Sequence, residues 1–110
     1  MSWYVLVERN DSLGGDNTWV LSQKVAVDGG RDAAVARAEE LCRTIGPREE
    51  YGRLVFRRSE TSWLVELTRE VRDGSRTWSH GSQLHVSVAE LVHSEETPPA
   101  PQPKRPWRRG

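Results

Sequence analysis

The side chains in this chain that are best suited to metal binding are three histidines, His80, His85 and His93, and one cysteine, Cys42. A zinc site needs three or four donors that converge on one point. His80 and His85 have opposite parity along an extended segment and point to opposite faces unless a bulge intervenes. The spacing therefore predicts surface histidines and no metal site.

Groups for covalent or acid-base catalysis also lack a recognisable pattern. The chain has no Gly-x-Ser-x-Gly turn and no cysteine near a histidine in sequence. The paired carboxylates Glu39-Glu40 and Glu49-Glu50 lie on a helix face and in a linker, where ordinary solvation explains them, and they lack the apolar setting of a catalytic acid. The glycine pairs lack the spacing of a phosphate-binding loop. We therefore expect a protein that is not an enzyme and binds no cofactor; an enzyme acting on a small molecule is the least favoured alternative.

Arginines and aromatic residues form a third group in the second half of the chain. Such a mixture on an exposed sheet can hold phosphates and stack bases of single-stranded nucleic acid. Acidic residues interleave with these arginines, however, and opposite charges on neighbouring strands commonly pair. We favour cross-strand ion pairs over nucleic-acid binding. The arginines are Arg53, Arg57, Arg58, Arg69, Arg72 and Arg76, near Phe56, Trp63 and Trp78.

The C-terminal residues 94–110 differ in composition from the rest of the chain. They contain five of the 6 prolines and end in four cations around one tryptophan: Lys104, Arg105, Trp107, Arg108 and Arg109. Prolines favour an extended, polyproline-like spacer that cannot join a packed core. We predict a disordered basic tail, which either only aids solubility or contacts an anionic membrane, a nucleic acid or a groove on a partner protein.

The remaining residues, 1–93, show the periodicities of one α+β domain. Alternating apolar and β-branched residues predict strands over 3–9, 18–27, 53–58, 63–71 and 76–80, the last continuing over 83–92 after a bulge at Gly81-Ser82. Apolar residues at spacings of three and four predict a helix over 31–45, which Gly46-Pro47 ends. The expected fold is β-β-α-β-β-β, an antiparallel sheet with one amphipathic helix packed on one face.

One helix cannot cover both faces of such a sheet. The second face is expected to carry Tyr4, Leu6, Leu54, Phe56 and Leu64, although Phe56, like Trp63, could equally belong to the core. An exposed apolar face usually meets a partner. We therefore favour a homodimer that forms through the sheet.

Composition limits the remaining possibilities. The 110 residues carry no formal net charge, and a single cysteine cannot form an intrachain disulfide. The N-terminal residues lack the basic region of a signal peptide, and no apolar run is long enough to span a membrane. We expect a cytoplasmic protein.

Together these patterns predict a small binding, adaptor or regulatory protein that contacts a protein partner of unknown identity through its sheet face and basic tail. The alternative is a nucleic-acid-binding regulator that uses the same arginines. The candidate contact residues are Arg57, Arg58, Arg69, Arg72, Arg76, Trp78, Lys104, Arg105, Trp107, Arg108 and Arg109.

Overall fold

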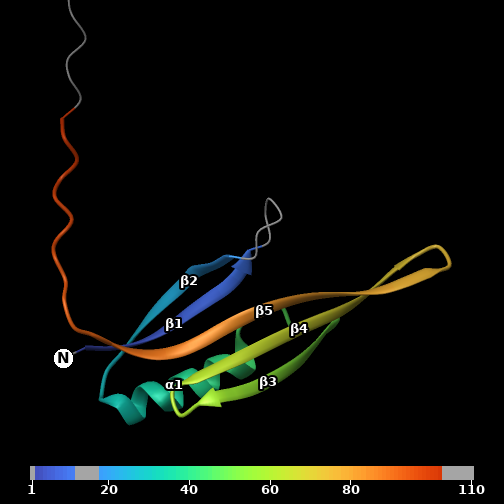
Figure 1. Cartoon of the computed structure of the whole chain (residues 1–110), viewed down its shortest axis with the longest axis horizontal. Coiled ribbons are helices and arrows are strands. Elements are labelled where there is room, and N and C mark those ends of the chain that lie inside the picture. Colours follow the sequence, from blue (N-terminus) through green and yellow to red (C-terminus); the bar gives the residue numbers. More distant parts are fainter. Residues whose placement is uncertain (1, 12–17, 103–110) are drawn as a thin grey trace, which may run out of the picture.

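A computed structural model describes residues 2–11 and 18–102. Its elements, in chain order, are β1 (Ser2–Asp11), β2 (Thr18–Val27), α1 (Arg31–Thr44), β3 (Tyr51–Ser59), β4 (Ser62–Asp73) and β5 (Arg76–Leu91). The strands form one sheet in the order β2-β1-β5-β4-β3, and all neighbours run antiparallel. Helix α1 lies on one face (Figure 1). The predicted fold class is confirmed.

Helix α1 begins and ends where the sequence indicates. Gly30, in an extended conformation, precedes the first turn, and the Ile45 N–H donates to the Leu41 carbonyl at the last turn. Gly46 then adopts a φ of 84°, a left-handed conformation that glycine tolerates without steric cost. Pro47 follows and cannot continue the helix.

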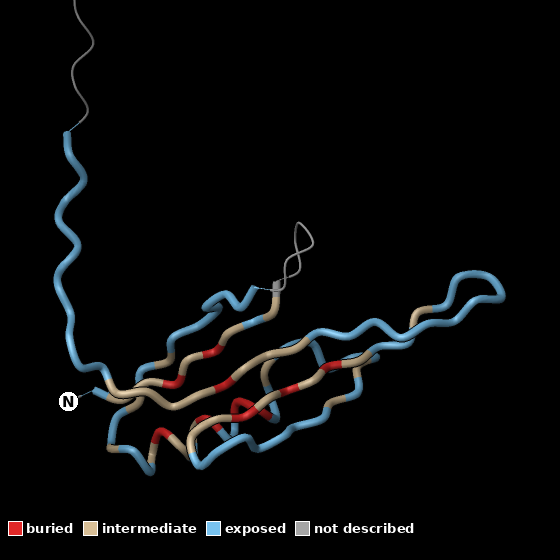
Figure 2. Tube along the Cα trace, in the orientation of Figure 1, coloured by how far each residue is buried: buried red, intermediate tan, exposed pale blue. Residues whose placement is uncertain are grey.

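The core lies between α1 and the sheet. Alternate residues of β1, β4 and β5 pack against one stripe of α1, as the sequence pattern predicts. The buried residues are red along these strands and the helix in Figure 2. Trp63 is part of this core, whereas Phe56 is not. The buried residues are Val5, Val7, Ala34, Ala38, Leu41, Cys42, Trp63, Val65, Leu67 and Val86.

The bulge predicted at Gly81-Ser82 is wrong. The pairing of β4 with β5 runs without a register shift from Ser62 opposite Ser87 to Asp73 opposite Arg76. A β-carbon at Gly81 would meet its nearest neighbour at an ordinary 3.7 Å, so this glycine fits a regular strand. Register shifts occur instead between Val7 and Glu8, in the pairing with β2, and at the end of β3.

Strands β4 and β5 extend beyond their neighbours. The last residue of β4 that pairs with β3 is Arg69, and the first residue of β5 that pairs with β1 is Leu84. Residues 70–83 therefore form a two-stranded projection, which we call the arm, and it is the long hairpin at the right of Figure 1. A tight turn at Gly74, with a φ of 63°, closes it.

After β5, residues 92–102 are exposed and form neither helix nor strand. The rest of the predicted tail, with Lys104, Arg105, Trp107, Arg108 and Arg109, lies outside the described residues. Within the described ranges, no helix has the length and apolar character required to cross a bilayer.

Candidate protein-interaction surface

The sheet face opposite α1, which we call the open face, carries large apolar side chains. Cross-strand register places the five predicted residues on this face: Tyr4, Leu6, Leu54, Phe56 and Leu64. Leu54 and Phe56 are about half exposed, at 52% and 50%. In the part of the chain that the structure describes, no helix or strand packs over this face.

Two further apolar residues, Trp19 and Leu21, lie on the open face because of a register shift that the sequence pattern does not predict. They share odd parity with Val25 and Val27, which face the helix, so an unbroken strand would direct all four to the core. The register shift in the β1–β2 pair skips Ser22, and it places Leu21 opposite Glu8 and Trp19 opposite Asn10. A one-residue shift of this kind reverses the face of every side chain beyond it.

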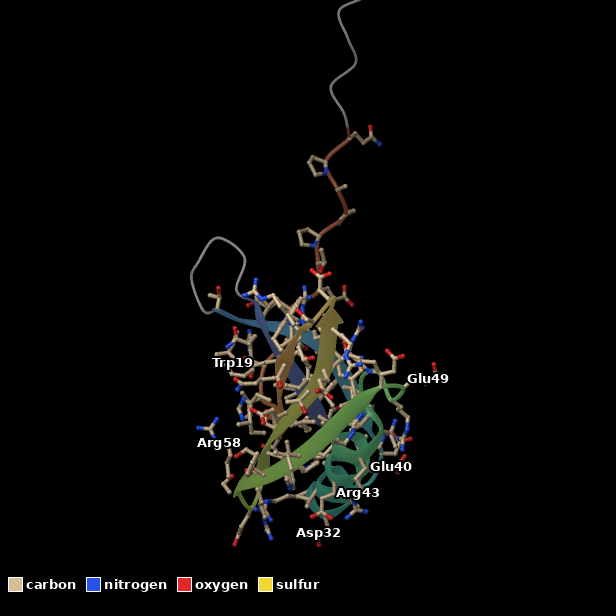
Figure 3. The ribbon with its side chains drawn as sticks, turned by 90° about the vertical axis from the view of Figure 1, so that its right-hand side faces the viewer. Trp19, Asp32, Glu40, Arg43, Glu49 and Arg58 are labelled. Carbon is tan, nitrogen blue, oxygen red and sulfur yellow. The ribbon has the colours of Figure 1, made fainter. Side chains whose placement is uncertain are left out.

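The centre of the open face is polar. Glu8 Oε1 lies 3.4 Å from His85 Nδ1, and the Trp19 ring meets the His85 ring edge-on at 6.2 Å between centroids. One row across all five strands therefore runs Leu21, Glu8, His85, Leu64 and Phe56. In Figure 3, Trp19 and Arg58 lie on this side of the molecule, away from the labelled helix residues.

A shallow hollow of about 330 Å³ lies at the end of the open face where β5 leads into the C-terminal segment. Its size is at the lower limit of small-molecule pockets. The hollow is predominantly apolar and is lined by Tyr4, Leu6, Lys24, Ala89, Glu90, Leu91 and Ser94.

On the helix side, a second hollow of about 240 Å³ lies between α1 and β3, and Cys42 is one of its lining residues. Burial raises the pKa of this thiol to about 11, and the nearby Glu39 carboxylate adds to the rise. With this pKa the Cys42 thiol stays protonated near neutral pH. It is therefore unreactive, because the thiolate is the reactive species. This hollow therefore contains no activated cysteine nucleophile.

The predicted arginines do not form one patch. Arg57 and Arg58 lie near the end of β3, close to the β3–β4 turn, whereas Arg72 and Arg76 lie on the arm at the opposite end of β4. Arg69, at the base of the arm, places its guanidinium carbon 5.9 Å from the centre of the Tyr51 ring. Trp78, on the arm, is exposed opposite Val71.

The expected cross-strand ion pairs of these arginines are wrong for the described residues. The Arg57 Nε donates to the Ser59 carbonyl, and Arg53 donates to carbonyls at the end of α1. Arginine-carboxylate pairs form elsewhere, between Arg31 and Glu60 and between Arg37 and Glu40. Of these arginines only Arg76 lies directly opposite a carboxylate, that of Asp73, and these two residues form no ion pair; alternating charges in the sequence do not specify the register that would oppose the others.

Within residues 2–11 and 18–102, no cluster of three histidine, cysteine, aspartate or glutamate side chains is placed to hold a metal ion. The described part of the chain thus forms an α+β domain in which one helix covers one face of an antiparallel sheet and the other, partly apolar face is uncovered. It has no significant match among models of protein families, curated proteins or solved structures.

Proposed function

We propose that this protein is a non-enzymatic interaction domain that binds a protein partner through the open face. The observation that carries the proposal is the set of large apolar side chains on the sheet face opposite α1, led by Trp19, Leu21, Leu54 and Phe56. Large apolar side chains exposed together on one face, here around a polar centre, are typical of protein-protein interfaces.

The spread of these residues favours a macromolecule over a small ligand. They lie on both edge strands of the sheet, β2 and β3, and on strands between them, while the hollow occupies one end only. Small-molecule sites instead enclose most of the ligand in a single concave pocket. A protein surface can contact the apolar side chains on all these strands together.

The charges on the open face indicate the chemistry of the partner. His85 lies beside Glu8, whereas Glu66, between Leu54 and Gln83 in the register, forms no ion pair with any described residue. A partner that covers Glu66 must supply a cation, because a buried unpaired carboxylate is costly. We infer a partner surface of aliphatic side chains that includes one lysine or arginine.

The experiment is capture of partners from a nuclease-treated lysate, followed by affinity measurement with the purified partner. Leu21→Lys, on the open face, should weaken binding at least about tenfold, because it places a charge in an apolar contact. The matched control is Val92→Lys, at an exposed residue just beyond β5. Equal binding by both variants would refute the proposal. A chain that ends at Glu96 tests the contribution of the basic tail.

Nucleic-acid binding is the second candidate, and the arm favours it. A two-stranded ribbon of this kind fits the major groove of DNA, and the arm presents Arg72, Arg76 and Trp78. Glu70 and Asp73 on the same ribbon oppose this function. Binding through the arm predicts an affinity that falls steeply with salt and is lost in Arg72→Gln/Arg76→Gln. Salt-insensitive binding to protein alone would exclude it.

A further inference from the structure

The outer edge of β3 is an unpaired, apolar strand edge. Leu54, Val55 and Phe56 are consecutive and are exposed by 52%, 42% and 50%. Leu54 and Phe56 point to the open face, while Val55 points to the helix side, where α1 packs mainly over β5 and β1 and leaves it uncovered. Among the residues that the structure describes, no strand pairs with this edge.

Unpaired strand edges can recruit a further strand from another chain, and proteins commonly block them with prolines, bulges or inward-pointing charges. Strand β3 contains no proline, its register shift lies at its end, between Arg57 and Ser59, and the charge of its inward-pointing Arg53 is bound at the end of α1. The apolar centre of the strand is therefore available for pairing.

We propose that a second copy of this chain pairs with this edge, so that the two β3 strands run antiparallel. A two-fold axis relates the copies and lies between Leu54 of one copy and Leu54 of the other. The two sheets join into one continuous sheet with both helices on the same face. This proposal deepens the predicted self-association by assigning it to the edge of the sheet, and it does not depend on the partner proposed above.

The charges of β3 select this register. Directly opposed residues of two antiparallel strands point to the same face of the sheet. The two-fold axis therefore lies where one residue of β3 is opposite its own copy. An axis at Val55 places Arg53 opposite Arg57 of the second copy, and like charges directly opposite each other are destabilising. An axis at Phe56 places Leu54 opposite Arg58 and Val55 opposite Arg57, which leaves two apolar side chains beside charges.

An axis at Leu54 produces one pair of an apolar and a charged residue, Val55 opposite Arg53, and the guanidinium of this arginine is already held by the Cys42 and Ile45 carbonyls of its own chain. The other pairs along the strand are compatible. Tyr51 lies opposite Arg57 of the second copy, which allows a cation–π contact. Gly52 lies opposite Phe56, so the aromatic ring can cover a position that has no side chain. Leu54 meets its own copy on the open face.

Beyond the strand, the same register brings opposite charges together. Arg58 of one copy comes near Glu50 of the second, the residue that directly precedes β3. Two-fold symmetry makes this pair occur twice. No like-charged residues oppose each other along β3 in this register. This self-complementarity identifies the second copy as the occupant of the edge.

The first test is sedimentation velocity of the purified full chain over a range of concentrations. We expect wild type to approach twice the 12.5-kDa monomer mass as concentration rises. Leu54→Lys should stay monomeric, because it places two lysines opposite each other at the axis. The monomer tolerates this lysine, which faces Glu66 on β4.

The matched control is Leu21→Lys, on the other edge strand β2, which is 49% exposed and faces Glu8. This variant should dimerise like wild type. A monomeric wild type at the highest attainable concentration overturns the proposal. Loss of the dimer in both variants also overturns it, since that result indicates packing through the open face instead of the β3 edge.

The second test concerns the register. Arg58→Glu should weaken dimerisation about tenfold, because each reversed charge then repels Glu50 of the second copy at two symmetric positions. Adding Glu50→Arg should restore wild-type dimerisation, and failure to restore it refutes the Leu54 register. Leu21→Lys distinguishes the two proposals. Partner binding through the open face predicts that this variant loses its partner, whereas dimerisation through the β3 edge predicts that it still dimerises.

Discussion

Arg53 offers the sharpest test of how this fold is held together, because one guanidinium joins β3 to the end of α1. Its Nη1 donates to the Cys42 carbonyl at 2.7 Å, and its Nη2 donates to the Ile45 carbonyl at 2.6 Å. The last carbonyls of a helix have no partner within the helix. The planar fork of an arginine can satisfy two of them at once.

The expected cost of Arg53→Met follows from these contacts. Each hydrogen bond from a charged donor contributes about 1.5–3 kcal/mol, and a cation at a helix C-terminus adds about 0.3–1 kcal/mol. Part of this sum is offset, because burial disfavours the charged guanidinium and lowers the pKa of Arg53. Water can also reach the freed carbonyls at the helix end. We expect a loss of about 2–3 kcal/mol in the free energy of unfolding.

The assay is urea unfolding followed by tryptophan fluorescence, since Trp63 is buried in the core. For a domain of this size, the loss corresponds to a fall in Tm of about 10–20 °C. Arg57→Met is the control: it lies on the same strand and face but donates only to the Ser59 carbonyl at 3.2 Å, and it should cost less than about 0.5 kcal/mol. Equal losses in the two variants would show that the reasoning about the helix end is wrong.

Three further predictions concern Cys42 and the entrance to α1. In the unfolded chain the Cys42 thiol has its ordinary pKa of 9.0, whereas the folded thiol stays protonated up to about 11, so its stabilising contribution is complete below pH 9 and is lost as pH rises toward 11. Between these pH values the free energy of unfolding should fall by up to about 1.4 kcal/mol per pH unit. Urea unfolding repeated across this range should show no such fall in Cys42→Ala. Identical slopes in wild type and in this variant would contradict the prediction. Gly29 has a φ of 119°, and a β-carbon there would lie 2.7 Å from the Ala33 β-carbon, so Gly29→Ala should lower stability by about 1–3 kcal/mol. Gly30→Ser should instead raise stability by about 0.3 kcal/mol, because a serine supplies the side-chain N-cap that Gly30 lacks. Thermal unfolding of the two glycine variants tests both predictions. A destabilised Gly30→Ser would contradict the capping argument.

The helix and strands were predictable because their signals are local. Period-two alternation over Trp63, Val65 and Leu67 and the three-and-four spacing of Ala34, Ala38 and Leu41 each identify one face of one element. The same alternation identified five residues of the open face. A pattern within one strand is enough for such assignments.

The candidate site was less predictable, and the arginines show why. Arg53, Arg57 and Arg58 are close in sequence, yet Arg53 serves the helix end while Arg58 lies at the turn. Arg72 and Arg76 belong to an arm whose existence depends on where β1 and β3 stop pairing. Proximity in sequence did not indicate a shared surface.

The sequence by itself determined the kinds of elements, their order and the face on which most residues of each strand lie. Only the tertiary structure decided that Trp19 and Leu21 reach the open face, that Gly81 forms no bulge and that Arg53 caps the helix. These features depend on register between strands and on packing between distant segments. Register is fixed by the sum of many cross-strand contacts, whereas periodicity is set by residues within a few positions of each other.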